Sequence, residues 1–86
     1  MKEQEVGHVS NFFKKISVAV VELTKGGLKN GDTVHIQGHT TDFTQDVESM
    51  QIEHESVPEA KKGDSIGLKV DHRVRKGDKV FRVSEA

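Results

Sequence analysis

Apolar and polar residues alternate in short stretches along most of this chain, as they do in β-strands with one buried face. In residues 33–38, for example, Val34 and Ile36 fall on one face and polar residues on the other. Turn residues interrupt the apolar stretches about every 8–12 positions, which favours a small barrel or sandwich over a helical fold. Six strands are therefore predicted, at residues 6–13, 16–23, 33–38, 45–54, 65–70 and 79–83.

The second predicted strand, residues 16–23, is apolar at nearly every position. A strand with one face in water alternates, whereas a nearly continuous apolar run is typical of a strand covered on both faces. Both faces of this strand are thus expected to be partly covered. One face would carry Ile16, Val18 and Val20, and the other Ala19, Val21 and Leu23.

The middle of the chain is less regular. Residues 39–44 are predicted to be a polar loop that carries one aromatic residue, Phe43. Residues 45–54 are predicted to be one longer strand whose alternation slips between Val47 and Met50, which indicates a β-bulge. Pro58, the only proline, places residues 57–62 in a connection.

Three Gly-Asp pairs, each shortly before a strand, predict tight turns. Glycine accepts a positive φ, and an aspartate beside it can accept hydrogen bonds from nearby amides. The pairs are Gly31-Asp32, Gly63-Asp64 and Gly77-Asp78.

The chain has 86 residues, which suits one domain with a thin core, because only 33% of the residues are hydrophobic. We expect a flexible N-terminus at residues 1–5 and a single β-barrel domain at residues 6–84. Val6 and Val9 are the expected inward residues of the first strand, with either Phe12 or Phe13.

Charge and cysteine content narrow the class of protein. The net charge of −1 excludes binding to nucleic acid through bulk charge, so such a contact would need a local basic patch. The absence of cysteine excludes disulfides and thiolate chemistry. No apolar run reaches the ~20 residues that span a bilayer, so we expect no membrane partner. We also expect the protein to be a monomer in the cytoplasm.

No arrangement in the sequence predicts catalysis, a cofactor or a metal. His35 and His39 are four residues apart, but on a strand that runs into a loop they do not share a surface. Glu53 and His54 point to opposite faces of their predicted strand, so they do not form a ready chelate. The serines lack a nucleophile elbow, and the glycines fit no phosphate-binding loop.

A basic cluster near the C-terminus is the best candidate for contact with phosphate. It contains Arg73, Arg75 and Lys76. The alternative is that these charges protect strand edges from pairing with another chain. Phe43 likewise has two interpretations, an exposed docking surface or a plug at one end of the barrel.

Five motifs, in order, resemble domain II of elongation factor Tu and related translational GTPases, and in particular the stand-alone proteins called translation elongation factor-like. They lie at residues 18–23, 25–38, 47–50, 60–68 and 74–80. The resemblance implies an all-β fold, a six-stranded, mostly antiparallel Greek-key β-barrel. In the full-length factors this barrel packs on the GTPase domain and, in elongation factor Tu, helps to hold the aminoacylated end of tRNA. A related barrel ends some collagenase-like peptidases.

The resemblance implies a non-enzymatic binding module in protein biosynthesis, with an RNA (tRNA or ribosome) or protein partner and no DNA. The alternative is an accessory module of a collagenase-like peptidase system that binds substrate or enzyme, which the near-neutral charge mildly favours. Glu48 and Gly67 match the family's pocket beside the bound adenosine. The residues expected to contact a partner are Glu48, Gly67, Phe43, His39, Arg73, Arg75 and Lys76.

Overall fold

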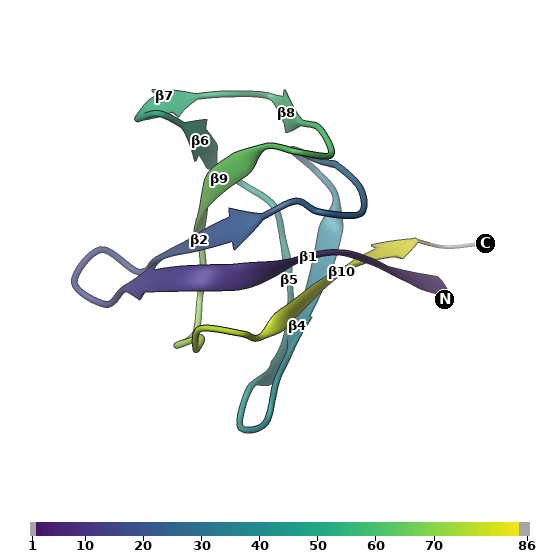
Figure 1. Ribbon diagram of the computed structural model, residues 1–86, viewed down its shortest axis with the longest axis vertical. Helices are drawn as coiled ribbons and strands as arrows, with labels where there is room; N and C mark the ends of the chain where they lie inside the picture. Colours follow the sequence, from purple (N-terminus) through teal and green to yellow (C-terminus); the bar gives the residue numbers. More distant parts are fainter. Residues whose placement is uncertain (1, 85–86) are drawn as a thin grey trace.

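The computed structural model describes residues 2–84, and every regular element in that range is a β-strand (Figure 1). All the strand pairings are antiparallel. The all-β, antiparallel prediction is confirmed, although the described residues form ten strands rather than six. The strands are β1 (Lys2–Phe13), β2 (Val18–Glu22), β3 (Leu28–Lys29), β4 (Thr33–Gln37), β5 (Asp42–Asp46), β6 (Met50–Ile52), β7 (Glu55–Ser56), β8 (Glu59–Ala60), β9 (Ser65–Lys69) and β10 (Lys79–Ser84).

Eight of the strands form one sheet in the order β5-β4-β10-β1-β2-β9-β6-β7, and β3 pairs with β8 in a separate ladder. The sheet curls strongly, so that β4 and β5 run across the direction of β1 and β2 (Figure 1). The side chain of Gln45 in β5, an edge strand of the sheet, also bonds to the backbone at the end of β9. The Gln45 side chain donates to the carbonyl of Lys69 and accepts from the amide of Asp71, both at 2.8 Å.

The long first strand begins earlier than its apolar pattern predicts. Lys2 to Glu5 belong to β1 and pair with Ser84 to Phe81 of β10, so residues 2–5 are part of the domain's sheet. The part of the flexible-terminus prediction that concerns Met1 lies outside the described residues. Two register shifts, between Glu5 and Gly7 and between Val9 and Asn11, bend β1 so that it pairs with both β10 and β2.

The three Gly-Asp turns are confirmed and share one construction. The φ angles are 95° at Gly31, 99° at Gly63 and 96° at Gly77. In each turn the aspartate carboxylate accepts a hydrogen bond from the amide three residues earlier; Asp78 Oδ2, for example, accepts from Arg75 N at 2.8 Å. The other two pairs are Asp32 with Lys29 at 3.0 Å and Asp64 with Lys61 at 2.8 Å.

Each turn is also tied to one buried residue from another part of the chain. Gly77 N donates to Val9 O at 2.7 Å, and Val9 N donates to Asp78 O at 2.8 Å. The same reciprocal pair joins the second turn to Leu23 and the first turn to Val47. Because these three residues are buried, the turns hold the surface to the core.

The prediction of one bulged strand at residues 45–54 is wrong. β5 ends at Asp46 and β6 begins at Met50. Val47 leaves the sheet because the turn at Gly31-Asp32 takes both its amide (2.7 Å) and its carbonyl (2.9 Å). The alternation slips there because the chain changes direction.

The prediction of a loop at residues 39–44 is also wrong in its second half, because β5 starts at Asp42 and pairs with β4. As an edge strand, β5 keeps polar side chains on its exposed positions and directs only Phe43 and Gln45 to less exposed ones. The predicted connection at residues 57–62 similarly contains the short strand β8.

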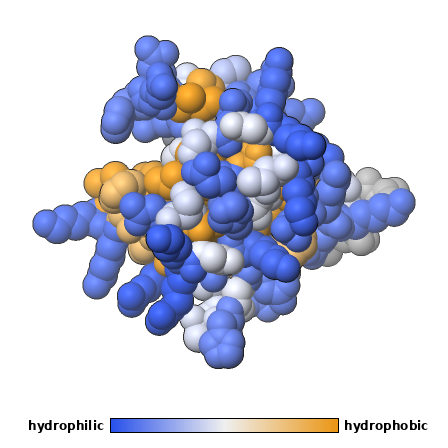
Figure 2. All heavy atoms as spheres, in the orientation of Figure 1, coloured by the Kyte–Doolittle hydropathy of each residue, from blue (hydrophilic) through white to orange (hydrophobic). Residues whose placement is uncertain are grey.

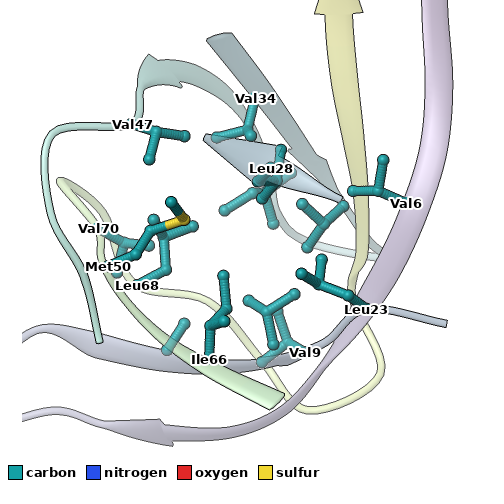
Figure 3. Close-up of a cluster of buried hydrophobic side chains, with 14 of the residues drawn as sticks. Val6, Val9, Leu23, Leu28, Val34, Val47, Met50, Ile66, Leu68 and Val70 are labelled. Carbon is teal, nitrogen blue, oxygen red and sulfur yellow. The ribbon is translucent and has the colours of Figure 1, made fainter. Parts of the chain in front are cut away.

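The core is made of aliphatic side chains that converge from nearly all strands (Figure 3). Val6 and Val9 are buried as predicted, whereas Phe12 is only partly buried and Phe13 is 48% exposed. The inward face of β2 supplies Ala19 and Val21, and Leu23 follows it. In the described part of the chain no helix is long and apolar enough to cross a membrane.

Candidate functional site

The outer face of β2 carries an apolar groove of about 240 Å³. Val18 and Val20 point outward from β2 and are only half-buried, while Ala19 and Val21 beside them point into the core. Figure 2 shows apolar atoms gathered on the left of the molecule, over the tip of the β1–β2 hairpin, with a hollow beneath β6 and β7. The groove is lined by Phe13, Ile16, Val18, Val20, Gln51, Glu53, His54, Ser65, Ile66 and Gly67.

Gly67 keeps the floor of this groove open. It lies opposite Val20 on β2 and opposite Gln51 on β6, so it stands in the middle of the outer face. A Cβ at Gly67 would lie 3.3 Å from Val18 Cγ1, which means that any side chain here would fill the groove. A glycine inside a strand weakens the strand and often marks a site that a ligand or another chain approaches closely.

One wall of the groove is the tip of the β1–β2 hairpin. Phe13 is 48% exposed and Ile16 is 58% exposed, and these are the exposed large hydrophobic residues among residues 2–84. Ser17, between Ile16 and β2, has a φ of 54°, and its carbonyl accepts a hydrogen bond from Val70 N at 2.9 Å. The hairpin tip is thereby held against the strand that follows β9.

The opposite wall is the β6–β7 hairpin. Its two turn residues, Glu53 and His54, have φ angles of 51° and 67°. Positive φ at both central positions defines the type I′ turn, which normally uses Asn and Gly because other residues lose about 1–2 kcal/mol there. Glu53 and His54 line the groove, and Ser17, the third non-glycine residue with positive φ in the described chain, lies between the lining residues Ile16 and Val18. Such strain clusters at binding sites.

Charges of opposite sign flank the two ends of the groove. At one end, Glu22 lies across from Ser65 and accepts hydrogen bonds from the hydroxyls of Ser65 and Ser10, the latter at 3.1 Å. Glu53 also lines the groove, and because Gln51 pairs with Gly67, the chain from Gln51 to Glu53 runs toward the Ser65 end. At the other end, Lys69 lies directly across from Val18, and Lys14 and Lys15 are exposed in the β1–β2 turn.

Most of the residues predicted to contact a partner lie elsewhere, near the β4–β5 turn. Phe43 and Arg73 line a separate shallow depression, and Phe43 contacts His72 edge-to-face with the ring centres 4.8 Å apart. Phe43 is partly buried and also packs against the core cluster. His39 is in the β4–β5 turn, and Arg75 begins the third Gly-Asp turn.

The other residues predicted to contact a partner lie apart from one another. Lys76 is exposed in the same turn as Arg75, and Glu48 is exposed between β5 and β6. Only Gly67 of the predicted set lines the apolar groove. Sequence reasoning missed the groove, although the apolar outer positions of residues 16–20 were a signal for it.

A polar cluster surrounds His35 on the outer face of β4. His35 Nδ1 lies 2.8 Å from Glu3 Oε1, and Nε2 lies 2.5 Å from Asp42 Oδ1. Ionised carboxylates only accept hydrogen bonds, so this arrangement favours the protonated ring, in which both nitrogens donate. The hydrogen bonds that His35 donates to Glu3 and then to Asp42 raise its pKa above 6.5, although burial opposes them. The two nitrogens point in opposite directions, which prevents chelation of one ion with both carboxylates.

Residues 2–84 contain no group of three or more side chains placed to hold a metal ion. No serine or threonine hydroxyl in that range is hydrogen-bonded to a histidine, and the serines that bond to side chains bond to Glu22. Among residues 2–84, the hydroxyls that bond to side chains bond to carboxylates, and no serine–histidine pair of the kind that activates a nucleophile is formed.

Comparisons with known proteins point to peptidases. No protein-family model matches the sequence. An uncharacterized protease of Methanocaldococcus jannaschii is 50% identical over 82 residues, 94% of this chain and 20% of that protein. A collagenase of Porphyromonas gingivalis is 37% identical over 78 residues, 90% of this chain and 22% of that protein. The chain thus spans about a fifth of the length of these curated relatives.

Solved structures share the fold. The C-terminal domain of a Geobacillus thermoleovorans protein described as a U32 peptidase matches with a TM-score of 0.86 and 19% identity, over 94% of this chain and 93% of that one. A selenomethionine variant of that domain matches with a TM-score of 0.83 and 20% identity, over 90% of this chain and 96% of that one.

These findings correct the assignment to translation. The similar proteins are peptidases and a collagenase, so the identification with elongation factor-like proteins and a role in protein biosynthesis is wrong. The five motifs consist largely of turn glycines, turn aspartates and alternating strands. Those residues specify a fold, and a fold is shared by proteins of unrelated function.

Proposed function

We propose that this domain is a non-catalytic module of a collagenase-like peptidase system and that it binds unfolded polypeptide substrate. The support is that similarity to the two curated relatives covers 90–94% of this chain but only 20–22% of theirs. Most of each relative therefore lies outside the similar region. The matched structure is likewise a C-terminal domain rather than a whole peptidase.

The observation that carries the proposal is the unfilled apolar groove over β2. A domain of this size has few hydrophobic residues, and two large ones, Phe13 and Ile16, remain exposed beside Val18 and Val20. An exposed apolar patch rimmed by polar residues marks a contact surface. Unfolded polypeptide presents the apolar side chains that such a surface accepts.

A binding role without hydrolysis is supported by the chemistry of the described residues. His35, the histidine with the strongest polar contacts, is occupied by two carboxylates. Ser10 and Ser65 both donate to the Glu22 carboxylate, and neither is hydrogen-bonded to a histidine. We propose that bond cleavage belongs to a separate catalytic region of the peptidase system, and that this domain acts as a monomer in the cytoplasm.

The closed six-stranded Greek-key barrel is also part of this proposal. Six strands have five or more residues, namely β1, β2, β4, β5, β9 and β10. The double hydrogen bond of the Gln45 side chain to Lys69 and Asp71 supports closure, since a side-chain amide there substitutes for a backbone ladder. A closed sheet would leave the outer face of β2 as the accessible apolar surface.

The proposal is tested by adding gelatin, and separately reduced and alkylated casein, to isotope-labelled protein while its amide NMR signals are recorded. We expect shifts at Val18, Val20 and Gly67, and we expect both polypeptides to remain intact on a gel. A compact folded protein of similar charge serves as the control and should cause no shifts. Absence of shifts with both unfolded polypeptides would overturn the proposed function.

A further inference from the structure

The size of the groove limits what it can bind. Its volume of about 240 Å³ is below the ~300–1,000 Å³ typical of sites for small molecules. Its ten lining residues are fewer than the roughly 20–30 per side that a stable interface between folded proteins uses. A narrow segment of chain that inserts one large apolar side chain fits these dimensions.

The groove has the right form for one inserted side chain. Val18, Val20 and Gly67, which has no side chain, form its floor, and Phe13 and Ile16 stand at its side. The strained turn at Glu53 and His54 bounds it opposite the hairpin. Both walls are short hairpins, so the site exists before a ligand arrives.

The charges give the site a polarity along β2. Glu22 at the acidic end and Val18, which faces Lys69 at the basic end, are four positions apart on the same strand. Four positions of extended chain span about 13 Å. In an extended ligand, side chains i, i+2 and i+4 point to the same side, so three of them would meet the acidic end, the apolar floor and the basic end together.

We propose that the groove binds an internal segment of unfolded polypeptide with a basic residue at i, a large apolar residue at i+2 and an acidic residue at i+4, or the same order reversed. The basic side chain lies toward Glu22 and Glu53, and the acidic one toward Lys69. This inference rests on the proposed function and adds the sequence preference of the bound segment.

The experiment uses peptides with blocked ends, so that only side-chain charges differ. The pattern Lys-Ser-Leu-Ser-Glu is compared with versions that carry two lysines, two glutamates, or serine in place of leucine. We expect the mixed-charge leucine peptide to bind most tightly, by about two- to fivefold over either same-charge peptide. The serine version should not shift the groove signals.

A charge exchange on the protein tests the orientation. Lys69→Glu should reverse the preference, so that the two-lysine peptide becomes the tightest ligand. Lys29→Glu, at an exposed lysine in the first Gly-Asp turn, is the matched control and should leave the order unchanged. Ile16→Ser should weaken all leucine peptides, and its exposed position means that the fold should survive, which the amide spectrum checks.

The outcomes separate this inference from the proposed function. If gelatin and casein bind but the peptide charges have no effect, the sequence preference is overturned and the binding module stands. If only peptides with free ends bind, the proposal that the groove binds an internal segment of a polypeptide is overturned. If no unfolded polypeptide binds while a second copy or a folded partner shifts the groove signals, both proposals are overturned.

Discussion

Two regions of the same sheet face outward, and they differ in how their side chains are satisfied. Around His35 on β4, the imidazole is 15% exposed, both nitrogens are bonded to carboxylates, and the ring lies 6.0 Å from that of Phe81. Over β2, Val18 and Val20 are half-buried and Phe13 and Ile16 stand in solvent. The polar groups of the first region find their partners within the domain, whereas the apolar side chains of the second remain partly exposed to solvent.

The difference follows from which residues stand opposite one another. The outward row at His35 pairs an imidazole with neighbours that can accept its protons, and polar outward positions are the norm for a sheet facing water. The outward rows of β2 place valine opposite Phe13 and opposite Gly67. Glycine offers nothing to cover valine. A sheet that is apolar on both faces needs a covering element, and residues 2–84 supply none that fills the groove over β2.

The largest expected effect is a loss of stability on the inner, buried face of β9, which lies opposite the face that carries Gly67. Leu68 is fully buried, and Leu68→Ala should lower the free energy of unfolding by about 2–5 kcal/mol because it leaves a cavity in the core. Urea denaturation measures this loss. A loss below about 1 kcal/mol would mean that the inner face of β9 is not the core.

The strained turn provides the next test. His54→Gly should raise the free energy of unfolding by about 1 kcal/mol, since glycine adopts a φ of 67° without penalty. If the strained wall shapes the groove, the same variant should bind unfolded polypeptide more weakly. Urea denaturation and the casein titration, run on one sample, measure both effects; a variant that gains no stability would contradict the strain.

The polar region should respond to pH. The pKa of His35 is raised in the folded protein by its bonds to Glu3 and Asp42, so folding favours the protonated ring. This stabilisation is complete below the unfolded pKa of 6.5 and is lost as pH rises through the folded pKa. We expect a loss of about 0.5–1 kcal/mol as the pH rises from below 6.5 through the raised pKa of the folded protein.

His35→Gln is the control for that pH dependence. Urea denaturation at several pH values should show a smaller slope in the variant than in the wild-type protein, and NMR titration of the ring should place the pKa of His35 above 6.5. Equal slopes in the two proteins would show that His35 does not couple folding to protonation. The apolar groove should be unaffected in either case.

The smallest effect on stability belongs to the groove itself. Ile16→Ser removes a side chain that is 58% exposed, so the free energy of unfolding should change by less than about 0.5 kcal/mol. Binding of unfolded polypeptide should nevertheless fall. A large loss of stability would instead indicate that the hairpin tip supports the fold rather than a ligand.

Many of the strands and turns were predictable from the local sequence pattern. The alternation at residues 33–38 and 65–70 predicted β4 and β9 closely, and the three glycines were placed in turns with positive φ as observed. The sequence failed at Val47, where a long-range hydrogen bond to the Gly31-Asp32 turn ends a strand. It also failed at β5, whose polar side chains conceal an edge strand.

The family assignment failed for a related reason. Turn glycines and alternating strands are similar in any small barrel, so they carried the resemblance to translation factors without carrying the function. Glu48 and Gly67 were predicted from the resemblance and the other contact residues from their side-chain types, and in the structure they lie in several places. Only Gly67 lines the groove, although it was predicted for a different pocket.

Local rules therefore account for the strands, the turns and the identity of the inward residues, since a side chain's face and a glycine's φ depend on its immediate neighbours. The groove depends on something else. Its walls come from residues 13–20, from residues 51–54 and from residues 65–67, which are far apart in the chain. Only the pairing of β2 with β9 and of β9 with β6 brings them together, because strand register is settled by contacts across the whole core.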